Sequence, residues 1–330
     1  MEIVVRNVNH AFSEVFQRLR ALNLKPEKTR NGPAIVFPGL VTTVYRRPRE
    51  RVLFHAGRDA NPIFHLMESI WMLAGRCDVA FLKQFVKRMA DFSDDGETFN
   101  AAYGYRWRNH FGHDQLVEVI ELLRRDPTTR QAVVQIWDHK DLTHNTRDKA
   151  CNTQIVFDVR HGHLNMTVFN RSNDIWWGAY GANAVHFSFL QEFVACAVDY
   201  PVGEYRQVSN NFHLYTELYD ATQYIENPPV RETYDYYDSK GIRPRLIMFE
   251  DDYESFLLEC KMFCDDPFNA KAHYFHTFFS DVAYPMAMVQ YVRRNKLGDG
   301  RNHASTIQAD DWRIAVQDWI DRREAKKASG

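Results

Sequence analysis

The sequence predicts an α+β fold in which a large mixed β-sheet is flanked by helices and followed by a helical C-terminal extension. The 330 residues are 45% hydrophobic and 14% aromatic, which is enough to fill a large buried core. Strand and helix patterns alternate as far as residue 250, whereas helical patterns dominate beyond it. We therefore expect one α+β domain over residues 1–250 and a helical extension over residues 251–330 that packs on the same domain.

Two helices have the clearest signals. Asn61 and Pro62 precede the apolar segment 63–73, as in a helix that is capped by asparagine and starts on proline. The amphipathic segment 114–125 ends before Asp126-Pro127, where proline disfavours a continued helix. Further helices are expected at 186–198, 251–264 and 309–327, and a loop at 297–303.

Strand patterns lie between these helices. Segment 131–137 (QAVVQIW) predicts a buried strand. Segments 153–160 and 163–171 alternate in polarity around His161-Gly162, which predicts a hairpin. Segment 226–245, which carries three prolines and a glycine, is the best candidate for a boundary before the extension.

Charge and cysteine content restrict the function classes. Lys and Arg number 41 and Asp and Glu 43, so no basic field for nucleic acid is expected. No apolar run approaches the length of a membrane span, and the N-terminus has no signal-peptide core. The five cysteines show no paired spacing, which favours reduced thiols and a cytoplasmic location. The histidine pairs lack further ligands at a recognised spacing, so no metal is expected: His110 with His113, and His161 with His163.

Three features can carry chemistry, and each has a structural alternative. Cys151 taken alone reads best as a small core residue, although a thiolate at a strand end is a nucleophile when a cation lowers its pKa. The run from Arg171 to Asp174 suits phosphate binding as well as a polar turn. Glu68 lies within an apolar helix, where a carboxylate is costly unless it is paired or functional; the alternative is an edge facing water.

Seven segments, in order and with closely similar spacing, resemble the thymidylate synthase and nucleotide hydroxymethylase family. Together they cover roughly residues 25–250. They are Arg30-Asn31-Gly32, HLMESIWML (65–73), AAYGYRW (101–107), DPTTRQAVVQIW (126–137), ACNTQ (150–154), NRSNDIWWGAYGANAVHF (170–187) and NNFHLY (210–215). The resemblance implies the family's fold, with sheets that pack back to back in a homodimer.

The resemblance also implies a role for each matching residue. Cys151 matches the nucleophile that adds to carbon 6 of a pyrimidine, Glu68 the glutamate that organises water and proton transfers, and Tyr103 a tyrosine near the proton on carbon 5. Further matches bind the nucleoside monophosphate: Arg30, Arg171 and Ser172 at the phosphate, Arg130 at the phosphate of the partner's site, His213 and Tyr215 at the sugar, and Asn183 at the base. Asp174 matches the carboxylate that holds the folate pterin, and Met89 lies in the segment that packs on the folate.

Asn183 matches with one extra residue in its loop and favours uracil, since cytosine-specific relatives tend to carry aspartate there. Other departures are Asn152 in place of a histidine and Gln131 in place of a second phosphate arginine. Segment 88–95 lacks the family's tryptophans, with Met89 and Phe92 roughly in their places, and the chain ends in a charged helix rather than a short apolar closing peptide.

Because closed lids and apolar walls exclude water, the last two departures favour addition of water over hydride transfer. The expected activity is therefore folate-dependent 5-hydroxymethylation of a pyrimidine nucleotide, with dUMP favoured over dCMP or CMP and 5,10-methylenetetrahydrofolate as co-substrate. Three alternatives stay open. In one, every motif is purely structural and the C-terminal extension is an interaction module. The other two keep a nucleotide site. One is a true thymidylate synthase, and the other is a non-catalytic nucleotide-binding relative.

Overall fold

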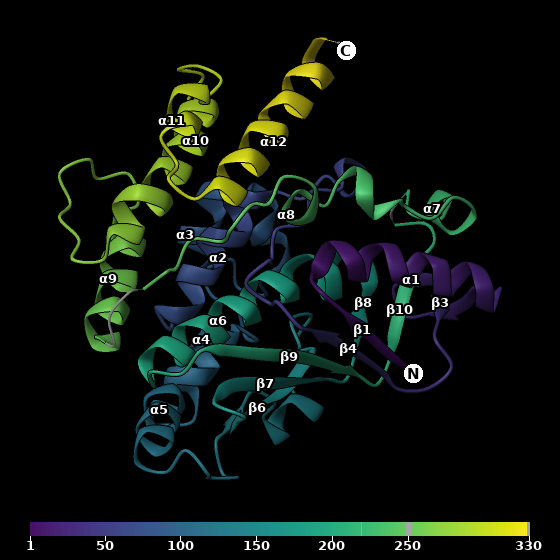
Figure 1. The fold of residues 1–330 in the computed structure, drawn as a ribbon, viewed down its shortest axis with the longest axis horizontal. Coiled ribbons are helices and arrows are strands. Elements are labelled where there is room, and N and C mark those ends of the chain that lie inside the picture. Colours follow the sequence, from purple (N-terminus) through teal and green to yellow (C-terminus); the bar gives the residue numbers. More distant parts are fainter. Residues whose placement is uncertain (219, 249–251, 329–330) are drawn as a thin grey trace.

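The computed structural model describes residues 1–218, 220–248 and 252–328 (Figure 1). Its main sheet has the strand order β1-β4-β9-β7-β6-β5. The strands are β1 (Glu2–Val5), β4 (Val41–Tyr45), β9 (Val202–Ser209), β7 (His163–Asn170), β6 (Asn152–Arg160) and β5 (Val133–Gln135). The β1–β4 and β7–β9 pairs are parallel and the other neighbours antiparallel, so the prediction of a mixed sheet is confirmed.

A second, smaller sheet was not predicted. Its order is β2-β3-β10-β8, and its strands are β2 (Glu27–Thr29), β3 (Gly32–Val36), β10 (Phe212–Tyr215) and β8 (Asn173–Asp174). These strands are two to five residues long, too short for an alternation of polarity to be recognised in the sequence. The small sheet matters for function because it joins the Arg30 turn to the segments that carry Asp174 and His213.

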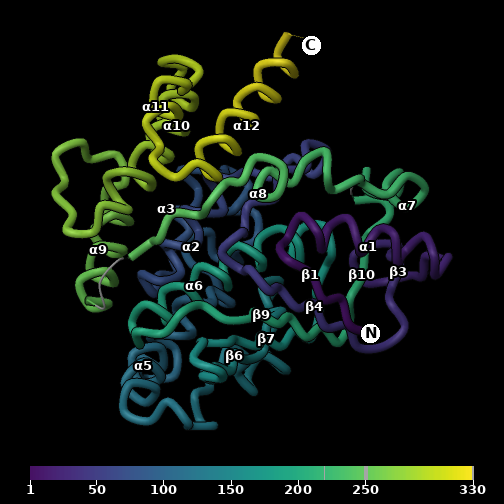
Figure 2. Tube along the Cα trace, in the orientation of Figure 1, coloured from purple at the N-terminus to yellow at the C-terminus, as the bar shows by residue number. Residues whose placement is uncertain are grey.

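Helices α1 and α6 pack against the main sheet, and helices dominate the chain beyond residue 252 (Figures 1 and 2). In the N-terminal part they are α1 (Val8–Leu22), α2 (Pro62–Leu73), α3 (Val79–Phe85), α4 (Tyr103–Tyr105), α5 (Gln115–Arg125), α6 (Asn183–Ala197), α7 (Gln223–Glu226) and α8 (Tyr236–Ser239). The later ones are α9 (Tyr253–Asp265), α10 (Tyr284–Arg294), α11 (Arg301–Ser305) and α12 (Asp310–Ala328). Among the described residues, no helix combines the length and apolarity that a membrane crossing requires.

The strongest local predictions are confirmed. Helix α2 begins at Pro62, and the Asn61 side chain accepts a hydrogen bond from the Phe64 amide at 3.1 Å. Asp114 caps α5 in the same way, through the amide of Val117. The predicted hairpin forms from β6 and β7, and both turn residues, His161 and Gly162, have the positive φ that such a turn requires.

Other predictions were wrong in extent. The strand predicted at 131–137 is only Val133–Gln135, and it is an edge strand with Val133 41% exposed, since only β6 pairs with it. The helix predicted from 186 begins at Asn183, and the loop predicted to 303 ends where α11 starts. The helix predicted at 251–264 is α9, although residue 251 lies outside the described residues. The helix predicted at 309–327 is α12.

Segment 226–245, the candidate boundary, packs against both ends of the chain. Tyr237 is 1% exposed, and its hydroxyl donates to the Asp311 carboxylate at 2.9 Å. The hydroxyl of Tyr234 donates to the Asn9 carbonyl at 3.0 Å. The segment thus bridges the first helix and the last. Residues 250 and 251, where the two parts were predicted to meet, lie outside the described residues, and the division at 250 stays a prediction.

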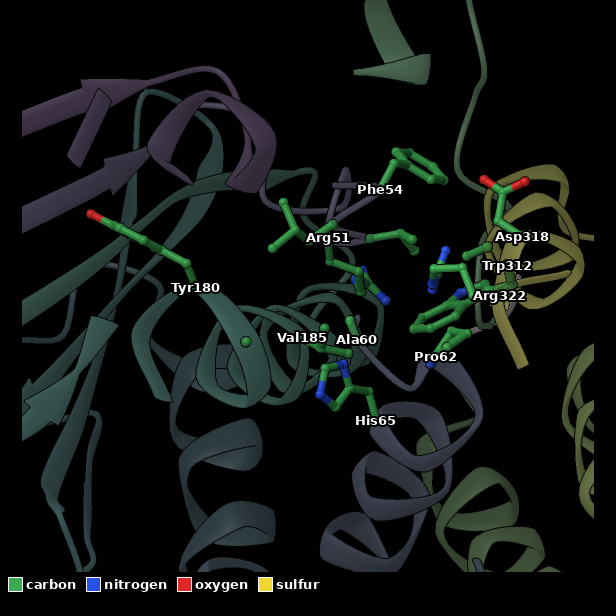
Figure 3. Close-up of a pocket in the computed structure, with 14 residues that line it drawn as sticks. Arg51, Phe54, Ala60, Pro62, His65, Tyr180, Val185, Trp312, Asp318 and Arg322 are labelled. Atoms are coloured by element: carbon green, nitrogen blue, oxygen red, sulfur yellow. The ribbon is translucent and has the colours of Figure 1, made fainter. Parts of the chain in front are cut away.

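The C-terminal helix α12 docks directly on the start of α2 (Figure 3). Asp59, just before α2, accepts hydrogen bonds from Arg322 at 3.0 Å, Arg323 at 2.7 Å and Lys326 at 2.9 Å. Beneath these contacts Trp312 and His65 line a cavity of about 20 Å³, enough for one water molecule. The extension therefore supports the helix that carries Glu68.

The glycine of AAYGYRW explains how α4 approaches α2. A Cβ atom on Gly104 would lie 1.9 Å from the Met72 carbonyl oxygen, and its φ is not positive, so the restriction is steric.

We predict that Gly104→Ala lowers the free energy of unfolding by about 3 kcal/mol, because two helices must separate. Urea denaturation measures this. Gly96→Ala, at a positive φ with no atom within 4 Å of the new Cβ, should lose only about 1 kcal/mol. Equal losses in the two variants would contradict the steric explanation.

Candidate active site

A cavity of about 490 Å³ opens where α2 and α6 meet the start of β6 and the small sheet. Every predicted site residue except Arg130 lines it: Arg30, Glu68, Met89, Tyr103, Cys151, Arg171, Ser172, Asp174, Asn183, His213 and Tyr215. An adjoining cavity of about 450 Å³ shares Arg30, Arg171, Ser172, His213 and Tyr215. Segments far apart in the sequence therefore converge on one continuous cleft.

Cys151 lies half-buried at the start of β6, held by its surroundings. Its backbone N–H donates to the Tyr103 hydroxyl at 3.3 Å, and its Sγ lies 3.9 Å from Nη2 of Arg171. Burial raises the pKa of the Cys151 thiol, and the Arg171 guanidinium lowers it by a smaller amount. Arg171 is thus a cation that favours the thiolate, but the effect of burial on the pKa is larger. The unliganded site therefore holds a protonated thiol that must lose its proton on reaction.

Arg171 is itself fixed in place. Its Nε donates to the Ala150 carbonyl at 2.8 Å, and its guanidinium lies over the Trp137 ring at 5.3 Å from the ring centre. Lys149 and Arg30 line the adjoining cavity beside it. Ser172 is half-buried, and it lines both cavities. Clustered cations with a hydroxyl form a site suited to a phosphate.

Glu68 is paired rather than turned to water. Its Oε2 lies 3.1 Å from Nε2 of His186, and the Glu68 side chain is 18% exposed. The ring of His65 stands perpendicular to that of His186, with 6.1 Å between their centres. Burial, with His186 and Arg58, lowers the pKa of His65, so this imidazole stays neutral.

Sequence reasoning missed both histidines, although the signal was there. His65 lies three residues before Glu68 on α2, and His186 three residues after Asn183 on α6. That spacing places each pair on one face of its helix.

His213 and Tyr215 follow each other on one face of β10, with their ring centres 4.8 Å apart. The Tyr215 hydroxyl accepts a hydrogen bond from the Asn31 amide at 3.2 Å, which ties it to the turn of Arg30. The Nδ1 atom of His213 is buried and makes no hydrogen bond to any described residue. A buried polar atom facing a cleft without a partner is suited to a ligand hydroxyl.

The far side of the cavity is apolar with one carboxylate. Its wall is formed by Trp71, Leu82, Met89, Phe92, Phe99 and Trp177. Asp174 accepts a hydrogen bond from the Trp177 amide at 2.6 Å through Oδ2, while its buried Oδ1 has no hydrogen-bond partner among the described residues. Burial raises the pKa of Asp174 to about 6. An apolar wall ending in such a carboxylate fits a flat heterocycle with N–H groups along one edge.

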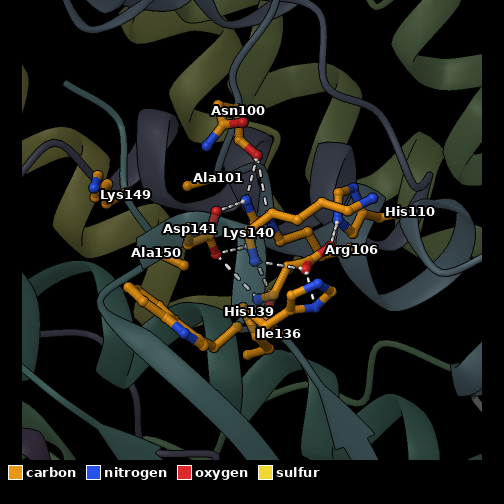
Figure 4. A network of polar contacts seen from close by, with 12 residues as sticks. Asn100, Ala101, Arg106, His110, Ile136, His139, Lys140, Asp141, Lys149 and Ala150 are labelled. Carbon is orange, nitrogen blue, oxygen red and sulfur yellow. Dashed lines mark hydrogen bonds and ion pairs between the residues drawn. The ribbon is translucent and has the colours of Figure 1, made fainter. Parts of the chain in front are cut away.

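A buried ion pair supports the site from behind (Figure 4). Arg106 is 1% exposed and pairs with Asp141, while its guanidinium also donates to the carbonyls of Asn100 at 2.9 Å and Ile136 at 2.9 Å. The Asp148 carboxylate accepts a hydrogen bond from the Ala101 amide at 2.8 Å. These bonds connect the segment of Tyr103 to the residues just before Cys151.

Arg130 lies away from the cleft of its own chain. It is exposed in the turn between α5 and β5, and it lines neither cavity. No group of three or more potential metal ligands occurs in the part of the chain that the structure describes.

Comparison with known proteins agrees with this geometry. A sequence profile of thymidylate synthase matches residues 59–233. The chain is 44% identical to a deoxyuridylate hydroxymethyltransferase of Pseudomonas phage M6, over 99% of this chain and 96% of that protein. It is 42% identical to a deoxyuridylate hydroxymethyltransferase of Bacillus phage SP01, over 54% of this chain and 49% of that protein.

A solved structure supports the fold. The crystal structure of thymidylate synthase from T4 phage superposes with a TM-score of 0.52 at 20% identity, covering 65% of this chain and 79% of that one. At this sequence identity the superposition shows a shared fold and carries no information about the reaction. Taken with the profile and the phage relatives, it leads to one assignment: the chain belongs to the thymidylate synthase family.

Proposed function

We propose that this protein is a deoxyuridylate 5-hydroxymethyltransferase that uses 5,10-methylenetetrahydrofolate. The observation that carries the proposal is the convergence of Cys151, Glu68 and Asn183 on one cleft with a cationic end and an apolar end. Similarity to the M6 phage enzyme over nearly the whole chain supports the same activity. The intact nucleophile disfavours the alternative of a non-catalytic nucleotide-binding relative.

The chemistry starts at Cys151. Its Sγ adds to carbon 6 of the uracil as the thiol proton leaves, and the electron pair of the carbon 5–carbon 6 double bond moves toward the carbonyl at carbon 4. Carbon 5 then bonds to the one-carbon unit, and loss of its own proton lets the folate nitrogen leave as tetrahydrofolate, so that a methylene remains on carbon 5. Tyr103, whose hydroxyl accepts a hydrogen bond from the Cys151 amide, would lie beside that proton. Methylenetetrahydrofolate, when bound, supplies the one-carbon unit. Asp174 and the apolar wall, including Met89, are the residues that would hold it.

Water completes the reaction. Its oxygen bonds to the methylene on carbon 5, its proton passes to the network of Glu68 and His186, and the electron pair returns to the ring as the bond between Sγ and carbon 6 breaks. No oxidant or reductant is needed. Phe92 is 53% exposed and Trp177 54% exposed at the apolar end, so this end is open to water. That openness favours the hydroxymethyl product over the methyl product of a true synthase.

The remaining nucleotide contacts follow the cleft. Arg30, Arg171 and Ser172 would hold the phosphate, and His213 and Tyr215 the sugar hydroxyl. Asn183 would read the base edge. An amide offers both a donor and an acceptor, which matches the O4 and N3–H of uracil.

A homodimer would supply the missing phosphate ligand. Helix α6 packs on one face of β7 and β9, but the opposite face presents half-buried side chains: Gln154, Val156, Thr167, Phe169, Arg206 and Val208. A second copy placed on that face would cover these side chains. In such a dimer the exposed Arg130 of each chain would reach the site of its partner.

Loss of the nucleophile tests the reaction. We predict that Cys151→Ala lowers turnover of dUMP by about a thousandfold or more, since no other group can form the bond to carbon 6. Mass spectrometry of the wild-type product should show hydroxymethyl-dUMP with tetrahydrofolate released. Formation of thymidylate and dihydrofolate would instead identify a true synthase.

The Asp174 carboxylate gives a pH test. Its pKa is raised to about 6, so it is ionised at pH 7 and becomes protonated as the pH falls through about 6. Because the protonated form loses an acceptor for the pterin N–H groups, we predict that the KM for methylenetetrahydrofolate rises below pH 6, approaching about tenfold per pH unit. Steady-state kinetics from pH 5 to 8 measure this. Asp174→Asn should have a high KM without that dependence, and an unchanged profile in this variant would contradict the assignment.

Mixed dimers test the shared site. Arg130→Ala and Cys151→Ala should each be nearly inactive, but a mixed dimer has one site with an intact Cys151 and the partner's intact Arg130. We predict that co-expression of the two variants restores roughly a quarter of wild-type activity, because about half of the dimers are mixed and each has one working site. A mixture no more active than the Arg130→Ala variant alone would show that Arg130 acts in its own chain or not at all.

A further inference from the structure

Behind Asn183 lies a chain of buried amides that the roles assigned above do not include. Asn183 Nδ2 donates to Asn173 Oδ1 at 3.1 Å. Asn173 Nδ2 in turn donates to Gln207 Oε1 at 3.0 Å and to Ser209 Oγ at 3.0 Å. Asn173 is 2% exposed, and Gln207 and Ser209 are each 1% exposed, so water does not compete for these bonds.

A backbone carbonyl fixes the direction of the whole chain. Gln207 Nε2 donates to the Ala179 carbonyl oxygen at 3.0 Å, and a carbonyl oxygen can only accept. Gln207 must therefore turn its Oε1 toward Asn173. Asn173 then presents its two N–H groups to Gln207 and Ser209, and its oxygen to Asn183. The Ala179 carbonyl thus fixes the orientation of Gln207, Gln207 fixes that of Asn173, and Asn173 fixes that of Asn183.

We propose that Asn173, oriented by Gln207, is a positioning residue that makes Asn183 selective for uracil over cytosine. This inference rests on the proposed function, because it assumes that Asn183 reads the base of the nucleotide. With Nδ2 held by Asn173, Asn183 has one N–H and its carbonyl oxygen left for the cleft. Uracil offers an acceptor at O4 and a donor at N3, which this arrangement satisfies.

Cytosine requires the opposite orientation. Its exocyclic amine is a donor and its N3 an acceptor, so both would be satisfied only if the Asn183 amide turned over. The turned amide would place its oxygen against the Asn173 oxygen, where two buried acceptors would face each other without a proton between them. A mispairing of this kind reduces binding by about 10- to 100-fold. The discrimination between uracil and cytosine therefore originates at Asn173, which holds the side-chain amide of Asn183.

The series also connects recognition to the scaffold. Asn173 lies on β8 of the small sheet, Gln207 and Ser209 on β9 of the main sheet, and Asn183 starts α6. A Cβ atom on Gly178 would lie 2.9 Å from Asn173 Oδ1, which explains why the loop before Asn183 carries glycine at this point. A purely structural function would join the two sheets without affecting which base is used, and the two functions are separable by experiment.

The test compares nucleotides within each enzyme preparation. For wild type, Asn173→Ala and Gln207→Met, kcat/KM is measured with dUMP and with dCMP at saturating methylenetetrahydrofolate. The ratio of the two values does not depend on the fraction of folded enzyme. Asn173→Ala frees the Asn183 amide, so the dUMP to dCMP ratio should fall by about 10- to 100-fold. Gln207→Met removes the fixed end of the series and should lower the ratio in the same direction.

Asn173→Asp is the matched control. A carboxylate still presents an acceptor to Asn183, so the preference for dUMP should persist even where stability is reduced. The binding of dUMP and dCMP is also measured by calorimetry in the Cys151→Ala background, where no reaction occurs. This separates recognition of the base from turnover.

Each experimental outcome leads to a different conclusion. A wild-type enzyme that does not prefer dUMP would show that the proposed substrate is wrong, whatever the variants do. A wild-type preference that survives in Asn173→Ala would overturn the inference and leave the proposed function intact. If Asn173→Ala yields no folded protein, an unchanged ratio in Gln207→Met overturns it equally.

Discussion

The buried ion pair between Arg106 and Asp141 is the interaction on which the placement of Cys151 depends. Arg106 donates to carbonyls on two separate segments as well as to Asp141, so its position fixes all three relative to one another. Removing either charge would leave the other buried and uncompensated, which is far more costly than losing a surface pair. Through Asp148 and the Ala101 amide the same network reaches the residues before Cys151. Cys151 is therefore positioned by contacts with the core and not only by its own loop.

The choice between water and hydride depends on different residues at the other end of the cleft. There the wall is apolar but incomplete, because Phe92 and Trp177 are more than half exposed. Helix α12 binds through Asp59 just before the start of α2. It stabilises the helix that carries Glu68, and its first contacts lie over His65 rather than over the apolar mouth. This arrangement holds Glu68 and His186 firmly and leaves the apolar end of the cleft accessible to water.

The sequence predicted those parts of the molecule whose signals are local or regular. The cap and proline of α2 and the hairpin turn at His161 each depend on a few neighbouring residues, and all were predicted correctly. The small sheet was missed because strands of two to five residues are too short to show an alternation of polar and apolar side chains. Hydrogen bonds to strands distant in the sequence define them instead. The site residues came from resemblance to a family, and the structure brings all but Arg130 into one cleft. His65 and His186 lie within two of the matching segments, and helical spacing places them beside Glu68 and Asn183, but the sequence analysis assigned them no role.

What sequence could not supply is the direction of the hydrogen bonds. An asparagine at position 183 is equally able to read uracil or cytosine, because its amide can turn over. The choice becomes definite only when its neighbours are known, and these lie 10 and 24 residues away along the chain, at Asn173 and Gln207. The last of them is oriented by the Ala179 carbonyl, a backbone atom that every residue type possesses. If Asn183 reads the base as proposed, selectivity between uracil and cytosine is therefore expected to depend on how two sheets and a helix hold this buried series, as well as on Asn183 itself.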